Sequence, residues 1–191
     1  MPLYSLTTCN MRRNKPRLLL ALYARPKHPD SYHYALMVSP KIGKTQLSDT
    51  ATKHHAVNTL QNISGKLMDP WRYECTTIPD VKDEHRLLVR VVVAKILDPQ
   101  VLNETLAAVP VYQPDDADVS NAKAFDCVVW VRTALENLRE SNATSDLLPF
   151  DEMEREALGY LRRKKSQERW SHGLHRQVPT YDLLCRRELV E

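Results

Sequence analysis

Two apolar runs constrain the fold of this chain more than any other feature. Leu18 to Tyr23 is continuous and short, which is typical of a strand buried on both faces of a sheet. Leu87 to Ile96 is rich in β-branched residues and suits the centre of a sheet. Three further stretches, residues 31–38, 52–59 and 71–78, also have strand-like patterns. The first half of the chain therefore predicts a series of consecutive sheet strands.

Helical signals begin only after these strands. Asp98 followed by Pro99 is a favourable start for a helix, because aspartate caps the free N–H groups and proline suits the first turn. Asp126 is predicted to cap a second helix that continues to about Arg139, and Asp151 a third that continues to about Trp170. Strands followed by helices predict an α+β domain with a mostly antiparallel sheet. We expect residues 1–16 to form a flexible lead-in, residues 17–140 the domain, and residues 141–191 a helical extension.

Composition excludes several classes of protein. The 191 residues suit one domain, and 42% hydrophobic with 27% charged residues is ordinary for a globular protein. A net charge of +3 does not require a nucleic-acid partner. Four widely spaced cysteines favour a reducing compartment, and no apolar stretch approaches the roughly 20 residues that span a bilayer, so we expect a cytoplasmic protein. No cofactor is indicated.

The predicted helix after Asp126 carries a cysteine, Cys127, in its first turn. The free N–H groups and the positive end of the helix dipole favour a thiolate there and make it a better nucleophile. Phe125 and Trp130 are spaced as a hydrophobic staple across the helix start. Val131, Leu135 and Leu138 recur on one face, which predicts that this face is buried.

A cysteine nucleophile needs a base, and histidines lie on two of the predicted strands. His33 is near the start of the strand at residues 31–38, on the face that it shares with Ala35 and Met37. His54 and His55 follow on the next strand, with side chains on opposite faces. Only one of these two can share a site with His33, and we prefer His55 because the face it shares with Val57 is the more apolar.

Short motifs around these residues resemble a known group of thiol enzymes. Residues 126–131, Asp-Cys-Val-Val-Trp-Val, are similar to the D-C-S-G-F-V helix start of the NlpC-type endopeptidases, whose fold is papain-like. Here the histidine strands precede the cysteine helix, as in the circularly permuted lecithin retinol acyltransferase-like branch. Its motif H-[WY]-A-[IL]-Y-V is similar to residues 33–38, His-Tyr-Ala-Leu-Met-Val, and its motif N-C-E-H-F-V is similar to residues 126–131. Ala24 to Leu36 also resembles a segment of small uncharacterised fungal proteins.

The resemblance implies a permuted papain-like domain and a cysteine-dependent hydrolase or acyltransferase acting on an amide, ester or thioester. Cys127 is then expected to attack the carbonyl, His33 to act as general base and then acid, and His55 to orient His33. Ser31 stands where the acyltransferases have a tyrosine, so we consider Tyr32 as an oxyanion donor.

The substrate is less constrained by the sequence. The acidic loop before the cysteine helix carries Asp115 and Asp116, which would disfavour an anionic small-molecule or peptide substrate if the loop borders the site.

Three alternatives remain open. The same fold could be a non-catalytic module that binds a small molecule or a protein. The basic run at residues 162–165, expected to point outward, could bind nucleic acid, although a net charge of +3 is too small to require such a partner. Few acidic residues lie near the histidines in the sequence, so we expect no metal site.

Overall fold

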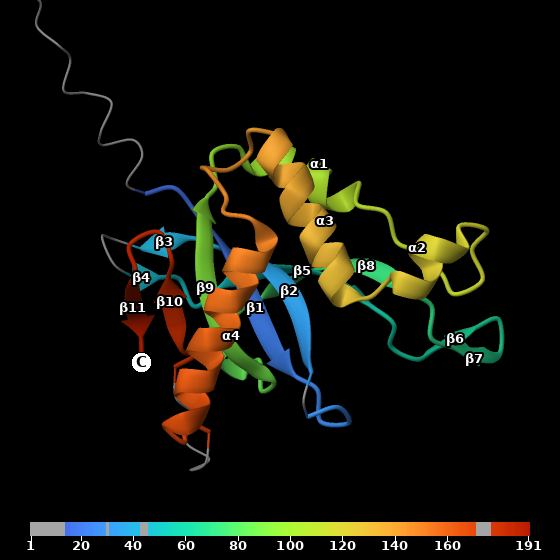
Figure 1. Ribbon diagram of the computed structural model, residues 1–191, viewed down its shortest axis with the longest axis horizontal. Helices are drawn as coiled ribbons and strands as arrows, with labels where there is room; N and C mark the ends of the chain where they lie inside the picture. The colour runs from blue at the N-terminus through green and yellow to red at the C-terminus, as the bar shows by residue number, and fades with distance from the viewer. Residues whose placement is uncertain (1–13, 30, 43–45, 171–176) are drawn as a thin grey trace, which may run out of the picture.

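The computed structural model describes residues 14–29, 31–42, 46–170 and 177–191. It is an α+β structure whose main sheet has the strand order β11-β10-β9-β1-β2-β5-β8 (Figure 1). The strands are β1 (Arg17–Ala24), β2 (Tyr32–Ser39), β3 (Lys41–Ile42), β4 (Gln46–Leu47), β5 (Ala51–Val57), β6 (Gln61–Ile63), β7 (Lys66–Met68), β8 (Arg72–Ile78), β9 (Leu87–Lys95), β10 (Thr180–Asp182) and β11 (Arg187–Val190). The helices are the 3₁₀ turn η1 (Val81–Asp83), α1 (Pro99–Ala107), α2 (Val119–Ala124), α3 (Cys127–Glu140) and α4 (Phe150–Ser166).

The main sheet is antiparallel except where β10 pairs parallel with β9. The five long strands coincide with the stretches that the sequence predicts, within two residues at each end. β1 lies between β9 and β2 and is buried along almost its whole length. A strand in that position has a layer of protein on each face, which explains the continuous apolar run.

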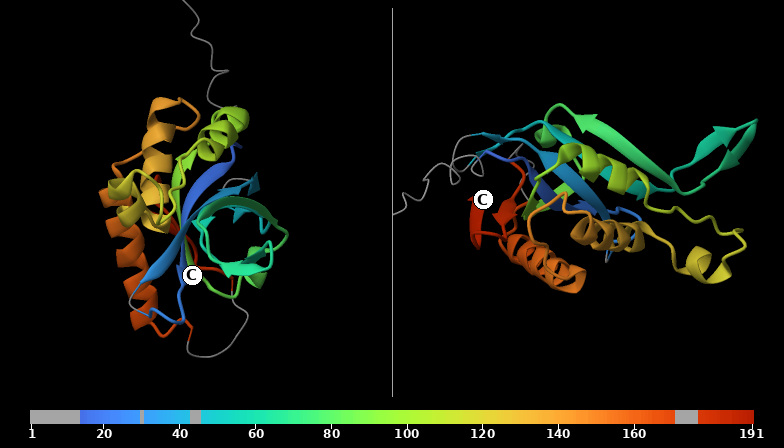
Figure 2. Two further views of the ribbon diagram at one scale, coloured as in Figure 1. Left: turned by 90° about the vertical axis from the view of Figure 1, so that its right-hand side faces the viewer. Right: turned by 90° about the horizontal axis from the view of Figure 1, so that it is seen from above.

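The two faces of the sheet carry separate hydrophobic cores. One core joins Leu20, Leu36 and Val91 to buried residues of α1, α3 and α4, so it is the helix-covered face. The other joins Leu19, Met37 and other residues of the opposite face to η1. Figure 2 shows α3 and α4 on the same side of the sheet. Because side chains alternate along a strand, successive buried apolar residues of β1 belong to the two cores in turn.

The C-terminal segment differs from the expected helical extension. Helix α4 forms, but its N-cap position is Pro149, which makes no side-chain cap hydrogen bond, and Asp151 lies in its first turn and pairs with Arg132. Strands β10 and β11 then extend the main sheet beyond β9. Residues 141–170 and 177–191 are therefore part of the same unit as the rest of the sheet. The sequence could not show this, because strands this short carry little local pattern.

Two other expectations concern charged segments. The basic run was expected to face outward, but Lys164 is 6% exposed and its Nζ lies 2.5 Å from Glu188 Oε1 on β11. The expected lead-in at residues 1–16 falls mostly outside the described residues.

Candidate active site at the start of helix α3

Helix α3 begins as the sequence predicts. Asp126 has extended backbone angles, and its Oδ1 accepts hydrogen bonds from the N–H groups of Val128 and Val129 at 2.8 and 2.9 Å. Cys127 is the first helical residue. The cap fixes the start of the helix, because these two N–H groups have no partner within it.

Aromatic side chains hold this helix end in place. Trp130 is fully buried, and its ring stacks on Tyr73 of β8 with 5.5 Å between centroids. Phe125, just before the helix, meets Trp71 and Tyr112 edge to face at 5.3 and 5.7 Å. These contacts attach α3 to β8 and to the loop before α2, and they account for the apolar residues on either side of Cys127.

The Cys127 thiol is buried, with 3% of the residue exposed. Burial raises its pKa, the Asp126 carboxylate adds to the increase, and the N–H of Tyr34, the charge of Arg25 and the N–H of Cys127 itself act in the opposite direction. The free N–H groups at the helix start therefore lower the pKa of the thiol, as expected. The expected net lowering of this pKa is wrong, because desolvation of the thiolate raises it by more.

His33 and His55 lie in contact. His33 Nε2 and His55 Nδ1 are 2.8 Å apart, and the rings meet at 66°. Burial lowers the pKa of His33 to about 4, with the charges of Lys53 and Arg25 adding to the effect. Burial also lowers the pKa of His55 to about 3, with His33 as the next contribution. Both imidazoles are therefore neutral at pH 7, so one ring nitrogen donates and the other accepts.

Glu74 is the charged group nearest to the other ring nitrogen of His55, Nε2, which is buried without a hydrogen-bond partner among the described residues. Its Oε2 lies 3.7 Å from His55 Nε2, and its Oε1 is held by Arg72 Nε at 2.7 Å. A carboxylate at this distance favours a proton on His55 Nε2 over a lone pair. His55 Nδ1 then accepts, and His33 Nε2 donates. The remaining nitrogen of His33, Nδ1, is left with a free lone pair, which is the state that a general base requires.

His54 lies on the opposite face from His55, as the alternation of the strand predicts. Its Nδ1 is 2.7 Å from the hydroxyl of Tyr73, on the helix-covered face of the sheet. Burial lowers its pKa to about 4. Of the two neighbouring histidines, His55 is the one that shares a site with His33.

The side chains of Cys127 and His33 lie on different faces of the sheet, beside the same stretch of β2. Tyr34, whose N–H acts on the Cys127 sulfur, packs with Cys127 in the core of the helix-covered face. The ring of His33 lies 6.0 Å from that of Tyr23, on the other face. Within the described ranges, the thiol makes no hydrogen bond to either imidazole.

The sheet is not continuous at that point. β2 and β5 pair only from Leu36↔His54 to Val38↔Thr52, although β5 continues to Val57 beside β8. The strands therefore diverge at His33 and Tyr34, and the His33–His55 hydrogen bond crosses between them. Tyr34, whose N–H lowers the pKa of the Cys127 thiol, lies in the part of β2 that does not pair with β5.

The other predicted site residues are Tyr32 on β2 and two aspartates on the loop before α2. Tyr32 is half-buried at the start of β2 and packs on the helix-side core. Asp116 Oδ2 accepts the N–H of Gln113 at 2.6 Å, so it closes a turn within its own loop. Asp115 is exposed on that loop. The structure brings together His33 and His55, with Cys127 across the strand.

Sequence reasoning missed Glu74 and the N–H of Tyr34. Glu74 lies on a strand that the sequence predicts, but its position opposite His55 depends on the pairing of β5 with β8. A pairing register between strands separated by a hairpin cannot be obtained from local pattern. The role of Tyr34 depends on strand divergence, for which the sequence carries no signal.

Neither a metal-binding cluster nor a membrane-spanning helix is present in the described residues. Among the residues described, no group of three or more histidine, cysteine or acidic side chains is arranged to hold a metal ion. In the same part of the chain, no helix has the length and apolar character needed to cross a membrane.

Comparison with known proteins identifies the family of the chain, but the function of that family is unknown. No curated protein and no solved structure matches the sequence. A family model described as a family of unknown function, DUF6914, matches residues 15–190. The match includes β10 and β11, in agreement with one structural unit. The chain with the Cys127 helix and the His33–His55 pair therefore belongs to the DUF6914 family.

Proposed function

We propose that this protein is a cysteine-dependent hydrolase or acyltransferase acting on an amide, ester or thioester. Cys127 Sγ attacks the acyl carbon while the thiol proton passes to His33 Nδ1, through one water or after the two side chains draw together around the substrate, because the described residues contain no direct thiol–imidazole hydrogen bond. The tetrahedral intermediate collapses to an acyl-thioester on Cys127, and His33 returns the proton to the leaving group. Water or an acceptor nucleophile then releases the acyl group in a second step of the same kind. His55 keeps the His33 ring in the required tautomer.

The observation that carries this proposal is the hydrogen bond between His33 and His55, with Glu74 behind it. A buried imidazole pair with a carboxylate at one end has a defined direction of donation. That direction leaves the base nitrogen on His33, next to the residue whose N–H acts on the Cys127 sulfur. A nucleophile, a base and a group that orients the base are the three parts that acyl transfer through a thiol needs.

The charge state of the site favours one form of the mechanism. The pKa of the Cys127 thiol is raised and that of His33 is lowered to about 4, so thiol and imidazole are both neutral at pH 7. The proton therefore moves during attack, by general-base catalysis, and no thiolate–imidazolium pair forms beforehand. The N–H of Cys127, at the helix start, donates a hydrogen bond to the developing oxyanion.

The fold and compartment belong to the same proposal. Histidine strands that precede a cysteine helix, in an α+β domain with a mostly antiparallel sheet, support the circularly permuted papain-like assignment. Cys75, Cys127 and Cys185 are free thiols. Free thiols at exposed positions suit a reducing compartment, and we infer a cytoplasmic location.

An acylation assay tests the function. Intact-mass spectrometry follows the protein during incubation with activated acyl esters and acyl thioesters, in a background with Cys9, Cys75 and Cys185 replaced by serine. We expect one acyl adduct, mapped to Cys127. The adduct should disappear with Cys127→Ser and form at least about a hundredfold more slowly with His33→Gln.

His55→Gln should have an intermediate effect, because it removes only the group that orients the base. The matched control is His54→Gln, a buried histidine of the same strand on the other face of the sheet. If His54→Gln slows acylation more than His55→Gln does, the assignment of His55 to the site is wrong.

A non-catalytic binding module is the second candidate. Two observations favour it. Among the described residues, the Cys127 thiol makes no hydrogen bond to His33, whose ring lies on the other face of the sheet. Cys127 is also 3% exposed and has a raised pKa, as expected for a structural cysteine. If the protein is a binding module, no acyl adduct forms on Cys127 in the wild type, so the variants Cys127→Ser and His33→Gln have no acylation rate to lower.

A further inference from the structure

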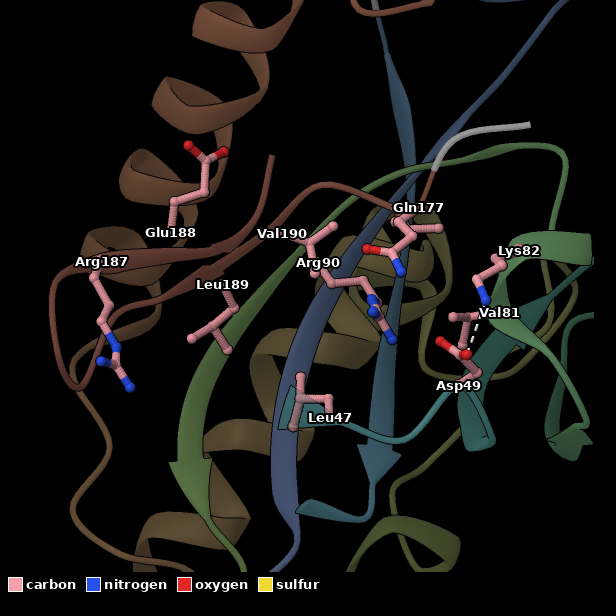
Figure 3. Close-up of a pocket in the computed structure, with 11 residues that line it drawn as sticks. Leu47, Asp49, Val81, Lys82, Arg90, Gln177, Arg187, Glu188, Leu189 and Val190 are labelled. Atoms are coloured by element: carbon pink, nitrogen blue, oxygen red, sulfur yellow. Dashed lines mark hydrogen bonds and ion pairs between the residues drawn. The ribbon is translucent and has the colours of Figure 1, made fainter. Parts of the chain in front are cut away.

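A pocket of about 380 Å³ lies on the sheet face opposite α3. Strand β9 forms its floor, and η1, the end of β4 and the C-terminal strand β11 form its walls (Figure 3). The lining includes apolar side chains of Leu47, Val81 and Leu189 and the polar side chains of Arg90 and Gln177. A pocket of this size that combines apolar side chains with convergent polar groups is of the kind that holds small ligands.

Arg90 is the unusual member of this lining. It interrupts the apolar sequence of β9, and it is 4% exposed. Its Nε donates to Thr180 Oγ1 at 3.2 Å, but its Nη1 is buried without a hydrogen-bond partner. Burial lowers its pKa to about 10, against the opposing effects of Asp49 and Tyr23, so the guanidinium is still charged at neutral pH. A buried charge with an unused donor is costly unless an anion meets it.

The carboxylates around the pocket are already paired. Asp49 Oδ2 lies 2.9 Å from Lys82 Nζ at one side. Glu188 is bound to Lys164 at 2.5 Å, and Figure 3 shows its side chain directed away from Arg90. Each carboxylate thus has its own cation. The guanidinium of Arg90, beside the amide of Gln177 in Figure 3, is the buried charge that has no full partner among the residues drawn there.

We propose that this pocket binds a small ligand through one carboxylate group, which pairs with Arg90, with the apolar part of the ligand against Val81 and Leu189. A planar carboxylate matches the donor geometry of a guanidinium. A single negative charge suits the site better than a dianion such as phosphate, because Asp49 and Glu188 repel additional charge. This site lies apart from Cys127 and does not depend on acyl transfer.

Isothermal titration of the full-length protein tests the site with three probes: hexanoate, hexanamide and inorganic phosphate. Hexanoate and hexanamide have the same apolar chain and differ in charge. We expect hexanoate to bind in the millimolar range or tighter, and hexanamide and phosphate at least about tenfold more weakly. Equal binding of hexanoate and hexanamide would overturn the role of the carboxylate.

Two variants locate the binding. Arg90→Met should weaken hexanoate binding at least about tenfold, whereas Arg187→Met, which removes the same charge from an exposed residue of the pocket rim, should change it less than about twofold. Without ligand, Arg90→Met should melt no lower than the wild type, because it removes an incompletely paired buried charge. Hexanoate binding that survives Arg90→Met would place the ligand elsewhere, the Cys127 site included, and would overturn the proposal.

A third measurement keeps the test independent of the folding of that variant. In the wild type, the Nε–H resonance of Arg90 should shift as hexanoate is added and stay unchanged with hexanamide. An Arg90 resonance that does not respond to saturating hexanoate contradicts the proposal as directly as an unaffected variant does.

Discussion

Mild acid should destabilise this protein strongly, because three imidazoles are held neutral in its interior. Burial lowers the pKa of His33 and His54 to about 4 each and that of His55 to about 3. In the unfolded chain each histidine titrates near 6.5. Below that pH the unfolded state binds protons that the folded state does not, so stability falls as the pH falls through this window.

The size of the effect follows from these values. Between pH 7 and pH 5, one histidine whose pKa is about 4 when folded and about 6.5 when unfolded costs about 2 kcal/mol of stability. The three together cost about 6 kcal/mol, which is comparable with the whole stability of many domains. We therefore expect the protein to be close to unfolding at about pH 5.

Urea unfolding followed by tryptophan fluorescence at pH 7, 6 and 5 measures this loss. His33→Gln should reduce the loss by about a third, since it removes one of the three histidines. His85→Gln, at an exposed position, should leave it unchanged. A wild-type loss below about 2 kcal/mol, or an equal effect of the His33 and His85 variants, would refute the reasoning, because it would mean that the buried imidazoles accept protons in the folded state.

Three predictions concern stability, each measured by urea unfolding at pH 7. Asp126→Ala should cost about 1–2 kcal/mol by removing two cap hydrogen bonds, and Asp126→Asn should retain most of that stability. Trp130→Ala should cost about 3–5 kcal/mol because it empties a fully buried site, whereas Trp170→Ala, at a residue that is 38% exposed, should cost less than about 1 kcal/mol. Glu188→Ala should cost about 3 kcal/mol by leaving Lys164 buried without its carboxylate, and the double variant Lys164→Met/Glu188→Leu should recover most of the loss.

The sequence predicts the parts of the fold that have strong local signals. β1 and β9 contain long apolar runs, and α1 and α3 start at aspartates that cap them. The face on which His33 lies also follows from alternation along one strand. β10 and β11 are short, and their place beside β9 is set by contacts between distant parts of the chain. Local pattern carries no information about such contacts.

The candidate site divides in the same way. Its cysteine and histidines can be selected from the sequence, because a capped helix start and strand alternation restrict where they point. The hydrogen bond between His33 and His55 and the position of Glu74 depend on strand register. The sign of the Cys127 pKa shift depends on burial, which the sequence does not reveal at a helix terminus.

The pH dependence of Cys127 acylation tests the central claim most directly. The rate of adduct formation with one thioester donor is measured between about pH 6 and about pH 8, in the background that keeps only Cys127. If neutral His33 is the base, the wild-type rate should be nearly flat over this range, because the pKa of His33 lies at about 4. The His33→Gln variant should be slower and should gain about tenfold per pH unit, as expected for a free thiolate. A wild-type rate that rises as steeply as that of His33→Gln would contradict the account, because the thiol would then react without help from the imidazole.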